Sequence, residues 1–348
     1  MKTVTIKDVA READVSIASV SRVLNGVGRV GEATRRRILH TAERLRYVPH
    51  EGARSLINQR TDTIGMILPD LHGEFFSEML RGADAAARAR GLHLLVSTSH
   101  GNADEAAAAV RSMRGRVDGL LIMCSQLEPD FASRHLPEGV PAVLMNARGV
   151  QGRSCVNVQD YEGAVTMVRH LAAAGAKRIA HIGGPAGNGD AEERLRGYLD
   201  ARPLPLDARY IVAGDFTAAS GFAAGLKLGS VDPLPDAVFA ANDMMAAGCL
   251  EAFGKLGLRV PHHIALGGFD DVPLAHFVRP ALTTMRINVV DLGGKALEQL
   301  AAATGASGSA MVHEEVVPEL VVRESCGHSI RGRSVQIEKD LEQGRYLK

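Results

Sequence analysis

Polar and basic side chains at close spacing near the start of the chain are the first residues that could do chemistry. Donor groups that suit phosphate oxygens are carried by Ser16, Ser21, Arg22 and Asn25. Small or apolar side chains that suit base edges are those of Ile17, Ala18 and Ser19. This segment therefore predicts contact with nucleic acid rather than catalysis.

Two short helices must position these side chains. Thr5 and Asp8 resemble a capping box that opens a first helix. Ser16 can cap a second helix, whose inward stripe consists of Val20, Val23 and Leu24. Two short helices joined by a few residues predict a helix-turn-helix, in which the second helix enters the major groove.

A third helix and the charge distribution support the same prediction. This helix is expected from about Glu32 to Arg46, and its basic cluster, residues 35–37, indicates phosphate contact. The whole chain is neutral, with 40 Lys and Arg against 40 Asp and Glu. Residues 1–60, however, hold 12 of those basic residues and 6 of the acidic ones. A basic head on an acidic body favours a nucleic-acid partner.

Short β-like runs alternate with helical patterns after residue 60. The expected strands are Thr63–Leu68, Leu92–Thr98, Gly119–Met123, Ala142–Met145, Arg178–Gly183, Ala237–Ala241, Ala265–Phe269 and Thr283–Ile287. A further helix is expected over 289–303, and a last strand, broken by Pro318, over Val316–Val322. This alternation predicts an α/β fold with two doubly wound parallel-sheet lobes behind the all-α head.

Signals for an enzyme, a metal site or a membrane protein are weak. The four cysteines form no C-x-x-C or zinc spacing, which indicates a reducing cytoplasm and no metal. Gly184–Gly189 is a glycine run that Pro185 spoils as a dinucleotide fingerprint, and no nucleophile elbow, H-E-x-x-H motif or P-loop occurs. We expect no cofactor, no signal peptide and no membrane span.

A series of motifs runs from the head to the end of the core. The head motifs are Thr5–Ala13 and Val15–Asn25, and the core motifs are Gly183–Pro185, Arg194–Tyr198, Gly214–Phe216, Ala241–Asp243, Gly267–Asp271, Leu282–Thr284 and Leu320–Ser325. In residue type and order they resemble the lactose/galactose repressor family, and the resemblance runs from Val4 to Ser325. It implies a ligand-responsive transcription factor with a DNA-binding head, a hinge and a dimeric periplasmic-binding-protein-like core.

The resemblance also implies domain boundaries. The head is expected over 1–48, and a hinge helix or linker over 49–60. The N-terminal lobe is expected over 61–158 with 288–314, and the C-terminal lobe over 159–287 with 315–325. Residues 326–348 would form a tail.

Further DNA contacts are expected outside the second helix. In the family, a hinge leucine wedges into the minor groove at the operator centre. The matching stretch here runs from Ala53 to Leu56, in which Leu56 is the wedge candidate and Ala53 is a further expected DNA contact. The alternative is that Leu56 packs on the core. The remaining expected DNA contacts are Thr5, Arg29 and Tyr47.

In the family, the effector site lies between the lobes, and its positions can be matched to this sequence one residue at a time. The residues at those positions are Phe75, Phe76, Asn146, Arg194, Phe216, Asn242 and Asp270. Arg194 would grip ligand hydroxyls or a carboxylate, Asp270 and Asn242 would exchange hydrogen bonds, and the phenylalanines would form aromatic walls. Asn146 stands where several sugar-responsive members carry Asp. As alternatives, Asp270 and Asn242 could cap helices or turns, and Phe75 and Phe76 could belong to the core.

These inferences predict a dimeric, sequence-specific repressor of a carbohydrate operon. Two heads would bind a palindromic operator in double-stranded DNA, and a sugar in the cleft would change operator affinity. Three alternatives remain: the same architecture with a nucleobase or nucleoside effector, a solute-binding protein without DNA function, and a cytoplasmic α/β enzyme.

Overall fold

The computed structural model describes residues 4–24, 28–47, 60–137, 139–150, 152–305 and 311–327. The chain divides into two compact units, a head unit of residues 1–63 with 115–118 and a core unit of residues 64–114 with 119–348. Asn25, Ala53 and Leu56 lie outside the described residues, as do most of the expected hinge and nearly all of the expected tail.

The head unit contains the three predicted helices. They are α1 (Ile6–Glu12), α2 (Ile17–Leu24) and α3 (Glu32–Arg44). The capping box at the start of α1 is present, because the Asp8 carboxylate accepts hydrogen bonds from the Thr5 backbone N–H at 3.0 Å and from its hydroxyl at 2.7 Å. A small core joins the helices through Val9, Ala10, Ala13, Val20, Val23, Ile38 and Ala42. The predicted helix-turn-helix is thus a self-contained packing unit.

The N-terminal lobe of the core unit is built on a six-stranded sheet. Its strand order is β11-β5-β4-β3-β1-β2, and the neighbours β1–β3, β3–β4, β4–β5 and β5–β11 pair in parallel. These strands are β1 (Thr63–Leu68), β2 (His93–Thr98), β3 (Gly119–Met123), β4 (Ala142–Met145), β5 (Ser154–Val158) and β11 (His313–Val316). Its helices are α5 (Glu74–Arg88), α6 (Ala103–Met113), α7 (Phe131–His135) and α13 (Val289–Gly305).

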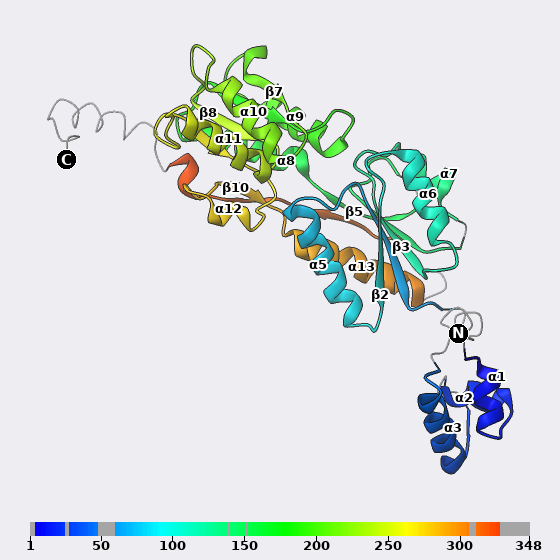
Figure 1. Ribbon diagram of the computed structural model, residues 1–348. Helices are drawn as coiled ribbons and strands as arrows, with labels where there is room; N and C mark the ends of the chain where they lie inside the picture. The colour runs from blue at the N-terminus through cyan, green and yellow to red at the C-terminus, as the bar shows by residue number, and fades with distance from the viewer. Residues whose placement is uncertain are drawn as a thin grey trace, which may run out of the picture. The chain divides into compact units, whose positions relative to one another are not determined.

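The C-terminal lobe is built on a parallel four-stranded sheet. Its order is β7-β6-β8-β9, with β6 (Ile179–Gly183), β7 (Ile211–Ala213), β8 (Ala237–Ala240) and β9 (Ala265–Gly267). The surrounding helices are α8 (Asp160–Ala173), α9 (Gly189–Ala201), α10 (Ala218–Leu228), α11 (Asp243–Lys255) and α12 (Leu274–Phe277), with two short 3-10 turns, Ala208–Tyr210 and Glu324–Cys326. Figure 1 shows both lobes as helices flanking sheets, which is the α/β architecture predicted.

The chain passes between the lobes three times. It crosses between β5 and α8, between β10 (Thr284–Arg286) and α13, and between β11 and β12 (Glu319–Val321). Strands β10 and β12 pair antiparallel in a two-stranded sheet of their own. Because all three connections are short, the lobes can change their relative angle only around these segments.

The last predicted strand differs from the structure. The sequence predicts one strand broken by Pro318 over Val316–Val322, but two strands of different sheets lie there, β11 ending at Val316 and β12 beginning at Glu319. The expected lobe boundary between residues 314 and 315 therefore falls inside β11. Proline has no backbone N–H and fixes its own φ, so the pairing of one sheet stops before Pro318 and a new pairing starts after it.

Two helices of the N-terminal lobe pack unusually closely. A Cβ added to Gly82 of α5 would lie 1.9 Å from the Val290 carbonyl oxygen, and one added to Gly293 of α13 would lie 2.2 Å from the Met79 carbonyl oxygen. Such distances leave no room for a side chain. The absence of Cβ atoms at these two positions is what lets α5 and α13 lie side by side (Figure 1).

Replacing Gly293 should therefore destabilise the core. We expect Gly293→Ala to lower the free energy of unfolding by about 2 kcal/mol, because the helices must separate. Gly294→Ala is the matched control: its Cβ would meet nothing nearer than the Gly82 carbonyl oxygen at 3.7 Å. That change should stabilise by roughly 0.5 kcal/mol through helix propensity. Urea unfolding followed by circular dichroism measures both, and equal effects would contradict the packing argument.

Candidate functional site

The outward face of α2 in the head unit carries the expected DNA-reading side chains. Ile17 is 45% exposed, and Ala18 and Arg22 are also exposed. The predicted cap is present, because the Ser16 hydroxyl accepts a hydrogen bond from the Ser19 backbone N–H at 3.2 Å. This face is free of the packing that holds the other side of the helix.

The remaining expected DNA contacts of the head differ in exposure. Arg29 is exposed, as is Thr5, whose hydroxyl is engaged in the capping box. Ser21 is partly buried, and Tyr47 is partly buried against the small core of the head. The basic cluster of residues 35–37 is exposed on α3. Exposed cations thus occur on α2, on α3 and, at Arg29, between these two helices.

A cavity of about 310 Å³ in the core unit is lined by residues of both lobes. Its charged and aromatic lining consists of Asp70, His72, Phe75, Phe76, His100, Asp190, Arg194, Asp215, Phe216 and Asp270. Most of these side chains lie just beyond the carboxyl ends of parallel strands. In α/β proteins this edge of the sheets is where ligands bind, because loops from several strands meet there.

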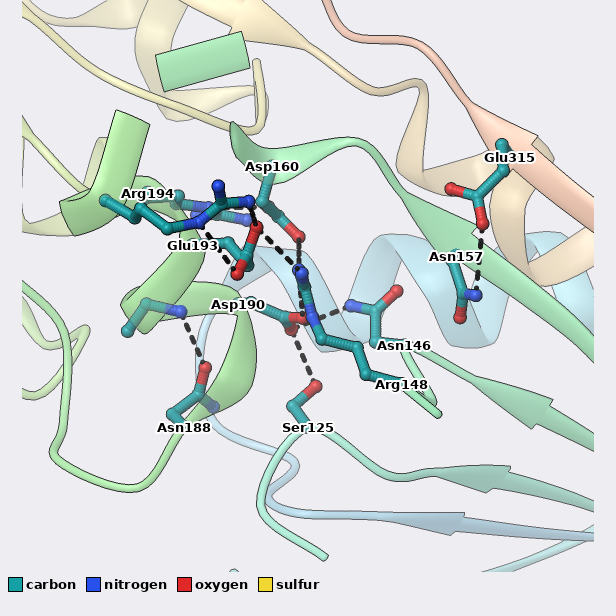
Figure 2. A network of polar contacts seen from close by, with 12 residues as sticks. Ser125, Asn146, Arg148, Asn157, Asp160, Asn188, Asp190, Glu193, Arg194 and Glu315 are labelled. Carbon is teal, nitrogen blue, oxygen red and sulfur yellow. Dashed lines mark hydrogen bonds and ion pairs between the residues drawn. The ribbon is translucent and has the colours of Figure 1, made fainter. Parts of the chain in front are cut away.

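Arg194 is the buried cation of this cavity. Its Nε donates to Asp160 Oδ1 at 2.8 Å, and its Nη2 lies 3.3 Å from Asp270 Oδ1 (Figure 2 shows the Asp160 side). Its Nη1 donates to the carbonyl oxygen of Ala241, and its guanidinium carbon lies 3.8 Å from the centre of the Phe269 ring. Position 194 on α9 therefore connects the ends of three separate segments of the C-terminal lobe.

Asp190, in the first turn of α9, contacts the other lobe. Its Oδ2 accepts hydrogen bonds from the Ser125 hydroxyl at 2.6 Å and from Asn146 Nδ2 at 2.8 Å. Both donors follow strands of the N-terminal lobe, Ser125 after β3 and Asn146 after β4. Figure 2 shows the three side chains converging. These two hydrogen bonds span the cleft.

Arg148 adds a second connection between the lobes. From the loop after β4, its Nη2 lies 3.2 Å from Asp160 Oδ2 and its Nη1 lies 3.2 Å from Glu193 Oε2. Asp160 therefore lies between two guanidinium groups, the buried one of Arg194 and the exposed one of Arg148 (Figure 2). A further contact occurs where Glu74 Oε2 of α5 accepts from the Leu274 backbone N–H of α12 at 2.6 Å.

Burial sets the protonation of the cleft carboxyls. It raises the pKa of Asp270 to about 7 although Arg194 acts against it, and the charge of Asp190 raises it further. Burial likewise raises the pKa of Asp160 to about 7 against the lowering effect of Arg194. Behind them, burial raises the pKa of Asp243 well above its ordinary value. Such perturbed carboxyls in a cleft are typical of functional sites.

Strained backbone occurs at the same place. Asp270 has φ 104°, Phe216 has φ 69° and Asn146 has φ 51°, all in the left-handed region that side chains rarely adopt. Asn242 supports one of them: its Nδ2 donates to the Phe216 carbonyl oxygen at 3.0 Å, while its Oδ1 caps α11 by accepting from the Met245 backbone N–H at 2.9 Å. Strain kept by surrounding contacts is common at ligand sites.

The structure brings most of the expected effector residues together. Those that line the cavity are Phe75, Phe76, Arg194, Phe216, Asn242 and Asp270. The alternative for Asn242, a helix cap, also holds, and so does the core alternative for Phe75 and Phe76, which pack against the hydrophobic core. Asn146 is the exception: it does not line the cavity, because its amide is directed to Asp190 and its Oδ1 is buried without a hydrogen-bond partner.

Several residues of the site escape prediction from the sequence. They are Ser125, Arg148, Asp160 and Asp190, which connect the lobes around Arg194. One signal could have found Ser125: it stands two residues after the expected strand Gly119–Met123, at the edge where parallel strands end. Asp160 stands two residues after β5 in the same way, but β5 is not among the strands expected from the sequence. Asp190 carries no such signal, since an acidic residue in the first turn of a helix usually serves the helix itself.

Two kinds of feature are absent from the described residues. They contain no cluster of three or more His, Cys, Asp or Glu side chains that could hold a metal ion. No helix in the described ranges is long and apolar enough to cross a membrane.

Comparisons with known proteins agree with this architecture. A model described as bacterial regulatory proteins, lacI family, matches residues 5–50, and a model of the periplasmic binding protein-like domain matches residues 168–326. The chain is 36% identical over 303 residues to Catabolite control protein A of Priestia megaterium, which covers 85% of this chain and 91% of that protein. It is 34% identical over 326 residues to the HTH-type transcriptional regulator GalR of Salmonella typhimurium (strain SL1344), covering 92% and 95%.

Solved structures are similar over nearly the whole chain. The lac repressor dimer bound to operator and the anti-inducer ONPF has a TM-score of 0.82 at 26% identity, covering 93% of this chain and 99% of that one. The complex of the transcriptional regulator CelR with cellobiose has a TM-score of 0.69 at 29% identity, covering 92% and 99%.

These relatives are transcriptional regulators and not enzymes. With a helix-turn-helix head, a two-lobed core and relatives that share more than 30% of its residues over most of its length, the chain belongs to the lacI family of bacterial regulatory proteins and is a DNA-binding transcriptional regulator with a ligand-binding core.

Proposed function

We propose that this regulator represses a carbohydrate-utilisation operon in the cytoplasm, binds a palindromic operator as a homodimer, and changes its operator affinity when a sugar-like effector occupies the cleft. The observation that carries the effector assignment is the cavity of about 310 Å³, where aromatic faces and hydrogen-bonding groups from both lobes meet. Ligand pockets of small molecules start at about this volume.

The lining chemistry suits a polyol. Phe75 and Phe76 lie edge to face, with ring centres 5.3 Å apart, on the side of the N-terminal lobe, and Phe216 lines the cavity from the C-terminal lobe. Apolar C–H faces of a sugar ring pack on such aromatic surfaces. Asp270 accepts and Arg194 donates hydrogen bonds, so ligand hydroxyls can be matched in both directions.

Two relatives support the same assignment by their names. One is the transcriptional regulator CelR in complex with cellobiose, and another is the Ribose operon repressor of Halalkalibacterium halodurans, 30% identical over 322 residues. The similar lac repressor structure is a dimer bound to operator. That similarity supports the homodimer proposed for this chain, and a two-fold symmetric dimer suits a palindromic operator.

Ligand binding would act through the contacts that cross the cleft. The lobes already meet through Ser125 and Asn146 on Asp190, and through Arg148 on Asp160. A ligand that contacts Phe76 on one lobe and Asp270 on the other favours one relative angle of the lobes over the rest. This is a shift between two populated states with different operator affinities.

The head would read DNA through α2. Ile17 and Ala18 offer apolar contact to thymine methyl groups, and Arg22 offers a charge-assisted hydrogen bond to phosphate. Arg22 is exposed at the last turn of the helix. Base reading and phosphate contact thus come from one helical face.

Removing the Arg22 guanidinium should weaken binding to any DNA sequence. We expect Arg22→Ala to reduce affinity for the palindromic site in the protein's own promoter region about tenfold and to lower the salt slope by about one, since one phosphate contact is lost. Fluorescence anisotropy at several salt concentrations measures both quantities. Arg169→Ala, an exposed arginine of the core, serves as the control. Unchanged binding in Arg22→Ala would remove this residue from the interface.

Replacing the aromatic ring of Phe216 should weaken the binding of the effector. A thermal-shift screen of mono- and disaccharides and nucleobases first identifies the ligand, because binding to the native state raises its melting temperature. We expect Phe216→Leu to bind that ligand about tenfold more weakly through lost ring packing. Phe222→Leu is the control, since Phe222 packs under Lys255 and does not line the cavity. A screen in which only nucleobases produce a shift would reject the carbohydrate assignment.

Ligand affinity should fall in acid. The Asp270 carboxyl, with its pKa raised to about 7 by burial, accepts ligand hydrogen bonds at both oxygens only when ionised. Since ligand favours the ionised form, affinity should be about tenfold lower at pH 6 than at pH 7.5 and should change little above that. Isothermal titration calorimetry across this range tests it. In Asp270→Asn the pH dependence should flatten, and an unflattened curve would assign the titration elsewhere.

A further inference from the structure

The charges around the cavity carry an inference about the class of ligand, and it rests on the proposed sugar-binding function. Among the described residues, the charged side chains that line the cavity are Asp70, Asp190, Asp215 and Asp270, against the single cation Arg194. Asp160, which does not line it, is buried directly behind Arg194. The cleft is therefore richer in carboxylates than in cations.

Arg194 can still donate to a ligand hydroxyl, but it offers a negative group little uncompensated charge. Its Nε is bonded to Asp160, its Nη1 to the Ala241 carbonyl oxygen, and its Nη2 faces Asp270 at 3.3 Å. The flat face of its guanidinium lies against the Phe269 ring, with 3.8 Å between the guanidinium carbon and the ring centre. The charge of this guanidinium is already shared between two buried carboxylates, so an acidic ligand would compete with both.

Arg148 does not alter the excess of carboxylates over cations around the cavity. It does not line the cavity, and it is engaged with Asp160 and Glu193, at 3.2 Å in each case. Its distance to the nearest oxygen of Asp190 is 3.9 Å, and that oxygen, Oδ1, is buried without a hydrogen-bond partner. Asp190 is thus a buried carboxylate whose charge is only partly compensated by protein groups.

Helix N-termini, the other common anion receptors, are also occupied. Backbone N–H groups at a helix start ordinarily attract phosphate or carboxylate. Around this cavity, α9 begins with the Asn188 cap and carries Asp190 in its first turn, and α11 begins with the Asn242 cap and Asp243. At α5 the first residue is Glu74. The first turn of α10 has no acidic residue, but its cap, Thr217, donates its backbone N–H and its hydroxyl to Asp215. A negative side chain of the protein therefore lies in or just before the first turn of each of these helices.

We infer that the cleft selects its ligand by charge through Asp190: it takes uncharged or aminated polyols and rejects sugar acids and sugar phosphates. A negative group in the cavity would meet Asp190 and Asp270, which are both buried and therefore poorly screened, so that repulsion between like charges is strong. Hydroxyl and ammonium groups bring donors that these carboxylates can accept. Asp190 is consequently a specificity-determining residue as well as a contact between the lobes.

A ligand series on common sugar frames tests the inference. The full-length protein is titrated by calorimetry with glucose, galactose and cellobiose, with glucosamine and galactosamine, and with glucuronate, galacturonate and glucose 6-phosphate. We expect the tightest binder to be uncharged or aminated, and its acidic counterpart to bind about a hundredfold more weakly. An acidic member that binds more tightly than its uncharged parent overturns the inference while leaving the sugar-binding function intact. Absence of binding by every sugar rejects the proposed function and, with it, this inference.

Two variants test whether Asp190 is the residue that discriminates against acidic ligands. Asp190→Asn removes the charge but keeps the shape and an oxygen for Ser125, and it should narrow the preference for the parent sugar over its acid at least tenfold. Glu192→Gln removes the same charge from the same turn of α9, but Glu192 is exposed and does not line the cavity, so the preference should stay within about twofold. Equal effects of the two variants would remove Asp190 as the determinant. If Asp190→Asn fails to fold, the comparison of ligands on the unchanged protein still decides whether acids are rejected.

Discussion

The buried guanidinium of Arg194 is the constraint on which the cleft depends. It pairs with Asp160 at 2.8 Å and approaches Asp270 at 3.3 Å; without it Asp270 would be buried and unpaired, and Asp160 would keep only Arg148 at 3.2 Å. Removing one partner of such a buried group costs several kcal/mol. The position of α9 relative to the ends of β5 and β9 is therefore held by charge as well as by packing, and the ligand cavity forms in front of this group.

Parallel topology explains why chemistry concentrates at one edge. In both lobes the strands end at the cleft, so the residue after each strand contributes to it: Ser125 after β3, Asn146 after β4, Asp160 after β5 and Asn242 after β8. Because these loops come from two lobes joined by short crossings, two side chains that face the cavity, those of Ser125 and Asp190, also connect the lobes. Ligand recognition and the angle between the lobes are thus coupled through shared groups, as for Asp190 with Ser125.

The head unit is organised differently from the core unit. Its three helices enclose a small apolar core, and α2 turns its Ile17 side away from that core. A unit that packs on itself can keep its reading surface constant while the core unit responds to a ligand. Under the proposed function, regulation requires no change inside the head, only in how the two heads of the dimer are presented to DNA.

Caps and helical periodicity act over a few neighbouring positions, so the helix-turn-helix and most strands of the core can be predicted from the sequence, as the Thr5–Asp8 box illustrates. Strands β5 and β7 are not among those predicted. Six cavity residues follow from the resemblance of short motifs, such as the one that holds Arg194, to those of a known family. That Arg194 meets Asp160, 34 residues away, and that Asp190 meets Ser125, 65 residues away, depends on the tertiary structure. It also turned Asn146 from the ligand toward Asp190 and divided Val316–Val322 between two sheets. Contacts over such separations leave no periodic signal, since they depend on how distant segments pack within a lobe and across the cleft rather than on any local preference.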